Sequence, residues 1–88
     1  MAYKVVVKPS AQRDLDSLDE REVERIALRV AHLTDEPRPF GVQKLTSTGG
    51  YRIRVGNYRV LYEVSDSRRQ VSIYRVKHRR DAYRRSRH

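Results

Sequence analysis

The sequence contains no cysteine, and none of its apolar runs approaches the ~20 residues that a membrane-spanning helix needs. Without cysteine, neither a disulfide framework nor a cysteine-ligated metal site can stabilise the fold. The first residues, MAYKVVVKPSAQRDLDSL, contain a short apolar run followed by polar residues, which is not the pattern of a signal peptide. These absences predict a soluble, cytoplasmic protein with no membrane partner.

The usual signatures of catalytic and nucleotide-binding sites are also missing. The sequence contains no GxGxxG motif, no P-loop and no GxSxG motif. Its three histidines, His32, His78 and His88, have no spacing that indicates a metal site. We therefore expect no metal, no cofactor and no small-molecule substrate.

The positive charge of the chain is concentrated in its second half. The 88 residues carry a formal net charge of +9. Residues 1–44 hold eight Lys or Arg and eight Asp or Glu, whereas residues 45–88 hold twelve against three. Such asymmetry is typical of proteins that bind nucleic acid, an acidic protein or an anionic membrane, and a merely basic surface is the alternative.

Residues 50–64, GYRIRVGNYRVLYEV, predict a β-hairpin around which the rest of the chain is organised. Apolar and polar residues alternate on both sides of Gly56-Asn57, and glycine at the first turn position suits a type I′ or II′ turn. This turn pairs Val55 with Tyr58, Arg54 with Arg59, Ile53 with Val60, Arg52 with Leu61 and Tyr51 with Tyr62.

The hairpin pairing divides the side chains between two faces. One face presents Arg52, Arg54 and Arg59. Like charges directly opposite one another destabilise a sheet by up to ~1 kcal/mol, so the pairing of Arg54 with Arg59 favours a polyanion-binding surface. Solvated strand positions without a function are the alternative. The other face is expected to enter the core: Tyr51, Ile53, Val55, Tyr58, Val60 and Tyr62.

The whole pattern predicts one α+β domain, residues 1–88, in which two N-terminal helices pack on a small antiparallel-rich sheet in the order βααβββ. The β-branched run at 3–8 predicts the first strand, whose position and direction in the sheet stay open. The other segments are a short extended piece at 42–45, a turn at 66–69, a last strand at 70–77 and a basic tail at 78–88 with one helical turn near 81–84.

Capping residues and apolar spacing predict the two helices, which we expect to form an antiparallel pair. Ser10 can N-cap a helix from residue 11 to about residue 18. Asp19 followed by Glu22 resembles a capping box and starts a second helix, which Pro37 is expected to end. The apolar stripe of this second helix is Val23, Ile26, Val30 and Leu33.

A basic sheet face can support one metal-free reaction. RNA carries its own nucleophile, the 2′-hydroxyl, which attacks the adjacent phosphate when it is held in line. Arginine can orient the strand and stabilise charge on the phosphate, but a pKa above ~12 makes it a poor proton carrier. Tyr83 and His78 are the nearby residues with usable protons, and Tyr83 has the alternative of stacking on an unpaired base.

Three segments carry a resemblance to a known family: KVVVKPSAQRDLDSL, QKLTSTGGYRIRVGNYRVLYEV and VSIYRVKHRRDAYRR. Over about residues 3–85 the chain resembles the RelE/ParE superfamily of toxins from toxin–antitoxin pairs, and within it the RelE branch. The resemblance implies a RelE-like fold and a cognate antitoxin. In that branch it also implies an endoribonuclease that cleaves mRNA in the A site of the 30S subunit of the ribosome and so inhibits translation.

The resemblance also implies a set of functional residues. Carried over by motif, they are Arg52 and Arg54, Arg59, either His78 or Arg79, and Tyr83. Because the strand positions are arginine where some members have lysine, no lysine general base is implied. The choice between His78 and Tyr83 for proton transfer stays open. The other basic residues expected to contact RNA are Lys44, Lys77, Arg80, Arg84 and Arg85.

Two other functions are compatible with the resemblance. ParE-like members inhibit DNA gyrase by binding it and cut no RNA, and they tend to lack the basic set with a C-terminal tyrosine. The second alternative is an inactive toxin that is retained as an antitoxin-binding co-repressor.

Overall fold

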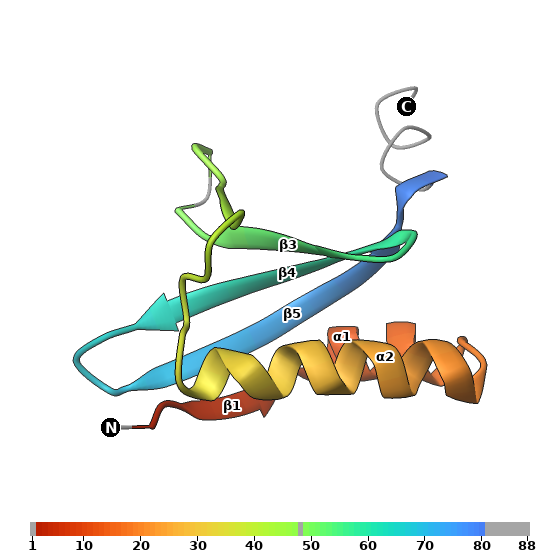
Figure 1. Cartoon of the computed structure of the whole chain (residues 1–88), viewed down its shortest axis with the longest axis horizontal. Coiled ribbons are helices and arrows are strands. Elements are labelled where there is room, and N and C mark those ends of the chain that lie inside the picture. Colours follow the sequence, from red (N-terminus) through yellow and green to blue (C-terminus); the bar gives the residue numbers. More distant parts are fainter. Residues whose placement is uncertain (1, 48, 81–88) are drawn as a thin grey trace.

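Two helices pack on a five-stranded sheet in the computed structural model, which describes residues 2–47 and 49–80 (Figure 1). The strands are ordered β1-β5-β4-β3-β2, with β1 parallel to β5 and the other pairs antiparallel. The predicted α+β class is confirmed, and the short extended piece is the edge strand β2. The elements are β1 (Lys4–Val7), α1 (Pro9–Asp16), α2 (Glu20–Ala31), a 3₁₀ turn (His32–Thr34), β2 (Gln43–Lys44), β3 (Tyr51–Val55), β4 (Tyr58–Ser65) and β5 (Gln70–His78).

The hairpin of β3 and β4 has the predicted register. All five cross-strand pairs, from Tyr51 with Tyr62 to Val55 with Tyr58, are present. Gly56 has a φ of +60°, whereas Asn57 is not among the residues with positive φ, and this combination is typical of a type II′ turn. The predicted separation of an apolar face from an arginine face therefore holds.

The apolar face of the sheet and the inner sides of the helices form the core. Ala11 and Ile26 supply its helical side, and both are buried. A one-residue slip of any strand would turn its buried side chains toward solvent, so burial of this face fixes the register. The buried sheet residues are Ile53, Val55, Val60, Tyr62, Val71, Ile73 and Val76, and Leu33 joins them from the 3₁₀ turn.

α1 covers the part of the β5 edge that β1 leaves open. β1 pairs with β5 only as far as Ile73. Beyond it, the Ser10 hydroxyl donates to the carbonyl oxygen of Tyr74 at 2.6 Å, and the Asp14 carboxylate accepts from the backbone N–H of Val76 at 2.8 Å. An edge whose polar groups are satisfied in this way does not invite pairing with another chain.

This contact also explains why the predicted cap of the first helix is wrong. α1 begins at Pro9 and has Lys8 as its N-cap, while Ser10 lies inside the helix and uses its hydroxyl on β5. α1 ends at Asp16, two residues earlier than expected.

The start of α2 was predicted correctly, but its end was not. The carboxylate of Asp19 accepts a hydrogen bond from the backbone N–H of Glu22 at 3.1 Å, which confirms the N-cap. The helix ends at Ala31, well before Pro37, because the chain tightens into the 3₁₀ turn. α1 and α2 run in opposite directions, as expected (Figure 1). Within the described residues, no helix is long and apolar enough to cross a membrane.

A β-bulge at Tyr74 changes which residues of β5 share a face. Ile73 pairs with Tyr62 and Arg75 pairs with Leu61, so Tyr74 is the extra residue. A bulge shifts the alternation of the residues that follow it by one position. Lys77 therefore lies on the same face as Arg59, its cross-strand partner.

A polar cluster ties the loop after α2 to the end of the sheet far from the hairpin turn. Arg38 donates two hydrogen bonds to the Asp66 carboxylate, at 2.8 and 3.2 Å, and one to the Tyr51 hydroxyl at 2.9 Å. The Tyr3 hydroxyl donates to the same carboxylate at 2.6 Å. The hydrogen bonds from Arg38, and then from Tyr3, hold the pKa of Asp66 below its usual range.

Tyr62 fixes the same loop from inside the core. Its side chain is fully buried, and its hydroxyl donates a hydrogen bond to the carbonyl oxygen of Pro37 at 2.7 Å. Burial raises the pKa of Tyr62 to about 12, so the hydroxyl remains a donor at every physiological pH. The loop that leads to β2 is thereby held at a fixed position relative to β3 and β4.

Candidate nucleic-acid interface

The face of the sheet that the helices leave uncovered carries a basic hollow of about 200 Å³. Arg52 and Arg54 come from β3, and Arg59 lies on β4 directly across from Arg54. The hairpin register alone thus gathers three guanidinium groups on one surface. We call this hollow the arginine site, and its lining residues are Gly41, Gln43, Arg52, Arg54 and Arg59.

Arg59 contributes an unsatisfied donor to the arginine site. Its Nη1 nitrogen is buried and has no hydrogen-bond partner within residues 2–47 and 49–80. Leaving a buried polar group unpaired costs ~1–3 kcal/mol, and more for a charged group. Phosphate oxygens match the planar fork of a guanidinium in both charge and geometry. The site therefore contains a donor suited to an anion that the described residues do not supply.

Repulsion between neighbouring cations on this face also favours the binding of an anion. Arg54 and Arg59 face one another across the hairpin, and Lys77 faces Arg59 from the other side. Lys77 is only 7% exposed, so its charge acts close to the sheet surface. A bound phosphate would offset the repulsion between these like charges.

Gln43 is a residue of the site that sequence reasoning missed. It pairs with Arg52 across β2 and β3, and its side-chain oxygen accepts a hydrogen bond from the Arg52 guanidinium. Arg54 is oriented more loosely, by a 3.5 Å contact from its Nε to the carbonyl oxygen of Gly56. The alternation that begins at Arg52 could have identified Gln43, but only if the pairing of the two-residue strand β2 were known.

His78 lies on the other side of the sheet from the three arginines. It pairs with Tyr58, one position beyond the pair of Arg59 with Lys77, and consecutive residues of a strand point to opposite faces. Its ring packs edge-on against the Tyr58 ring, with the centroids 5.1 Å apart. Its Nδ1 accepts a hydrogen bond from the backbone N–H of Arg80 at 3.1 Å, which leaves the proton of a neutral ring on Nε2.

The remaining predicted residues do not line the arginine site. Lys44 is exposed and pairs with Tyr51, so it points to the face opposite Gln43. Arg79 and Arg80 are exposed directly after β5, and the backbone N–H of Arg79 donates to the carbonyl oxygen of Asn57 at 2.9 Å. This bond places the start of the tail beside the hairpin turn. Tyr83, Arg84 and Arg85 lie outside the described residues.

In the part of the chain that the structure describes, no group of three or more His, Cys, Asp or Glu side chains could hold a metal ion. The arginine site presents guanidinium groups, which are suited to binding, orientation and stabilisation of negative charge.

Comparisons with known proteins agree on one family. The family model described as the ParE toxin of type II toxin–antitoxin systems matches residues 5–83. The chain is 36% identical to Toxin RelG of Mycobacterium tuberculosis over 87 residues, which cover 97% of this chain and 100% of that protein.

Two solved structures are also similar. One is the RelBE2 toxin–antitoxin complex of Mycobacterium tuberculosis, with a TM-score of 0.80 and 31% identity over 89% of this chain and 99% of that one. The other is the archaeal RelE–RelB complex of Pyrococcus horikoshii, with a TM-score of 0.79 and 34% identity over 90% of this chain and 97% of that one. The fold, the sequence match and the family model together show that the chain belongs to the ParE toxin family of the RelE/ParE superfamily, and that it is a RelE-like toxin of a type II toxin–antitoxin system.

Proposed function

We propose that this toxin is a metal-independent endoribonuclease that cleaves mRNA in the A site of the 30S subunit and so inhibits translation in the cytoplasm. The observation that carries the proposal is the arginine site with the buried, unpartnered Nη1 of Arg59. Three guanidinium groups gathered on one open face suit the backbone of a polyanion, and RNA is the polyanion that carries its own nucleophile.

The reaction requires in-line geometry before it requires a base. The 2′-hydroxyl loses its proton and attacks the adjacent phosphorus, and a new O–P bond forms. The bond to the 5′-oxygen of the next nucleotide breaks, and that oxygen takes up a proton. Arg52 and Arg54 are suited to hold the phosphates on either side of the scissile bond, and Arg59 to stabilise charge on the transferring phosphate. None of the three can move a proton at neutral pH.

Proton transfer falls to a residue outside the arginine site, and we assign it to Tyr83. His78 packs against Tyr58 on the other side of the sheet, and its Nδ1 is occupied by the N–H of Arg80. Arg79 begins the tail beside the hairpin turn, so the segment that carries Tyr83 starts close to Arg54 and Arg59. The remaining predicted residues, Lys44, Lys77, Arg80, Arg84 and Arg85, would contact RNA or the ribosome through its phosphates.

A cognate antitoxin is the second partner that we propose. The two similar structures are complexes of a toxin with its antitoxin. An antitoxin rich in Asp and Glu would complement the basic half of the chain and keep the toxin away from the ribosome. An apolar hollow of about 290 Å³ between β1 and the helices, lined by Val5, Val7 and Ile26 among others, could accept its apolar residues.

Inhibition of DNA gyrase is the alternative, because the matching family model is that of ParE toxins. An inactive toxin that binds only its antitoxin is a further alternative. Induction of the chain followed by primer extension on translated mRNA separates these possibilities. Cuts within codons would support the ribonuclease. Loss of DNA supercoiling by gyrase without cuts in mRNA would support the ParE-like function. The absence of both effects would support the inactive co-repressor. Equal cutting of naked and ribosome-bound RNA would contradict the requirement for the A site.

The role of the arginine site is tested by Arg59→Ala. Removing one preorganised donor to a developing negative charge lowers a rate by roughly 10²–10³-fold, and we expect a loss of this size in single-turnover cleavage on ribosomes. The matched control is Arg21→Ala, which removes an exposed arginine from α2 and should leave the rate near wild type. Wild-type cleavage by Arg59→Ala would remove the arginine site from the mechanism.

A further inference from the structure

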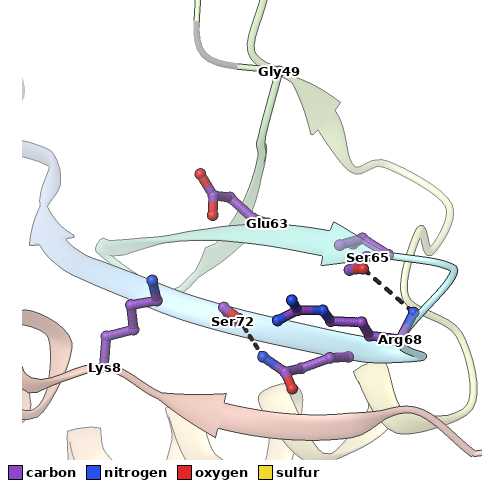
Figure 2. Close-up of a pocket in the computed structure, with 8 residues that line it drawn as sticks. Lys8, Gly49, Glu63, Ser65, Arg68 and Ser72 are labelled. Carbon is purple, nitrogen blue, oxygen red and sulfur yellow. Dashed lines mark hydrogen bonds between the residues drawn. The ribbon is translucent and has the colours of Figure 1, made fainter.

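We propose that a second hollow on the uncovered face of the sheet is a phosphate subsite for the same RNA strand, several nucleotides away from the scissile bond. This inference rests on the proposed ribonuclease function. The hollow has a volume of about 430 Å³ and is lined by Lys8, Glu63, Arg68, Gln70 and Ser72, among others (Figure 2). We call it the Lys8–Arg68 hollow.

Two cations enter the hollow from opposite ends. Lys8 follows β1 and Arg68 lies in the turn between β4 and β5. In Figure 2 both side chains lie over β5 on either side of Ser72, and the guanidinium of Arg68 extends toward Ser72. Within the described part of the chain, neither side chain forms an ion pair or a hydrogen bond. Two unpaired cations that converge on one hollow are suited to a single shared anion.

The floor of the hollow supplies a neutral donor. Ser72 is only 9% exposed, and its Oγ accepts a hydrogen bond from Nε2 of Gln70 at 3.2 Å. Because the oxygen is used as the acceptor, the hydroxyl hydrogen can be donated to a ligand. An ammonium, a guanidinium and a hydroxyl that line one hollow form a donor set for phosphate oxygens.

Glu63 limits where the anion can lie. It pairs with Ser72 across β4 and β5, and it forms no ion pair with Lys8 or Arg68 in the described structure. Its carboxylate repels a phosphate from the β4 side of the hollow and leaves the β5 side, between the two cations, as the favourable position. The charges of Lys8, Arg68 and Glu63 sum to +1, which balances the single negative charge of one phosphodiester.

The spacing of the two hollows fits one strand of RNA. Glu63 is four residues from Arg59 on β4, which corresponds to ~13 Å at the usual rise of a strand. A single strand with a stacked rise of ~3.4 Å covers this distance in about four nucleotides, and in fewer when it is extended. Leu61, half-buried between them on the same face, offers apolar surface to a base or ribose. An RNA strand along β4 would therefore reach both hollows, whereas a dinucleotide would not.

The test uses the full-length toxin and labelled RNA whose 2′-hydroxyls are methylated, so that it binds without being cut. In fluorescence anisotropy, the double variant Lys8→Ala/Arg68→Ala should bind an octanucleotide about tenfold more weakly than wild type. The slope of log affinity against log salt should fall by roughly 0.7, because one phosphate contact is lost. Its affinity for a dinucleotide should be unchanged.

The matched control removes the same charge from the helices. Arg13→Ala/Arg21→Ala also lowers the net charge by two but changes only exposed residues of α1 and α2. If both double variants bind the octanucleotide equally, the subsite does not exist. An equal loss for octanucleotide and dinucleotide would also overturn it, since the effect would then not depend on length. Thermal melts identify any variant whose loss reflects unfolding, and the single Arg68→Ala variant then replaces it.

A third arm distinguishes RNA from a protein partner. If the Lys8→Ala/Arg68→Ala variant loses affinity for an acidic peptide of alternating Asp and Glu but keeps its affinity for the octanucleotide, the hollow belongs to a protein interface and the proposal is wrong. Cleavage of mRNA on ribosomes by the wild-type toxin is measured in parallel. Absence of cleavage would refute the proposed function, while the octanucleotide data would still decide whether the subsite binds RNA.

Discussion

Arg59 and Tyr83 are expected to perform different parts of the reaction, because their side chains differ in the one property that separates binding from proton transfer. A guanidinium keeps its charge at all working pH values, and that of Arg59 has a buried donor with no hydrogen-bond partner among the described residues. A phenol is neutral at the same pH and can donate a proton or a hydrogen bond. Substitutions of the two residues should therefore give different kinetic patterns.

Tyr83→Phe removes one hydroxyl and keeps the ring. If the hydroxyl takes part in proton transfer, single-turnover cleavage should fall by roughly 10²–10⁴-fold, the usual effect of losing an acid–base group, while ribosome binding stays nearly unchanged. The control is Tyr83→Ala, which also removes the ring. Wild-type cleavage by Tyr83→Phe together with impaired Tyr83→Ala would mean that Tyr83 only stacks on a base, and would return proton transfer to His78.

The sequence predicts the arginines of the site better than it predicts their neighbours. Arg52, Arg54 and Arg59 follow from alternation around a turn whose position glycine reveals. The face on which His78 lies does not follow, because unbroken alternation from Gln70 would place it on the uncovered face. The bulge at Tyr74 reverses that assignment, and no residue type in β5 predicts the bulge.

The Lys8–Arg68 hollow illustrates a second limit at this scale. Lys8, Arg68 and Ser72 come from three segments that only the finished sheet brings together. Lys8 lies beside Ile73 because its backbone N–H bonds to that carbonyl oxygen at 2.9 Å, a contact that depends on the parallel pairing of β1 with β5. The spacing of these residues in the sequence does not predict that they line one hollow.

At the scale of elements, α1 stabilises β5 through its edge as well as through the core. Asp14 accepts from the backbone N–H of Val76 and from Nε of Arg75, each at 2.8 Å, and its side chain is 20% exposed. Hydrogen bonds to a charged group contribute ~1.5–3 kcal/mol. Without Asp14, the backbone N–H of Val76 at the edge of β5 would lose this acceptor.

We therefore expect Asp14→Ala to lower the free energy of unfolding by roughly 1.5–3 kcal/mol in urea melts, with an added tendency to aggregate through the exposed edge. The matched control is Asp16→Ala, which removes the same charge from the same helix. Asp16 is exposed, and among the described residues it accepts only a local hydrogen bond from Gln12, so its loss should cost much less. Equal destabilisation by the two substitutions would show that the edge contact contributes little.

The elements themselves were predictable where local signals were strong. The hairpin register, the turn at 66–69 and the N-cap at Asp19 were predicted correctly because each depends on residues adjacent in sequence. The start of α1 was not, because the hydroxyl of Ser10 is used in a contact with Tyr74 instead of a cap. The direction of β1 does not follow from the sequence for the same reason: nothing within residues 3–8 specifies a parallel partner more than sixty residues away.

For the molecule as a whole, the uneven charge along the chain separates a helical layer with balanced charge from three basic strands of the sheet. Residues 1–44, with balanced charge, supply both helices, while residues 45–88 carry the net charge of +9 and supply β3, β4 and β5. Proximity of like charges on one face favours encounter with any polyanion. We therefore expect an acidic antitoxin to compete with RNA for the same surface charge.

Binding of an acidic antitoxin should accordingly depend on salt. We expect the association rate, measured by stopped-flow fluorescence, to fall by at least tenfold between about 20 and 300 mM salt, because the steering charges are exposed and screened beyond the Debye length of ~10 Å at 0.1 M. The Arg13→Ala/Arg21→Ala variant serves as a control for charge outside the basic face. A rate independent of salt would contradict electrostatic recognition and favour the apolar hollow beside β1.

The pairing of β1 with β5 joins the first strand of the chain to the last. A ribosome makes β1 and both helices long before β5, so during synthesis they have neither their parallel partner nor the β5 part of the apolar face on which they pack. Val71, Ile73 and Val76 of the core arrive only with that last strand, as does Lys77 beside Arg59. A nascent chain interrupted before residue 70 would carry the hairpin arginines but no finished sheet to hold them. We therefore expect the arginine site to be held in place only after the final strand has been translated.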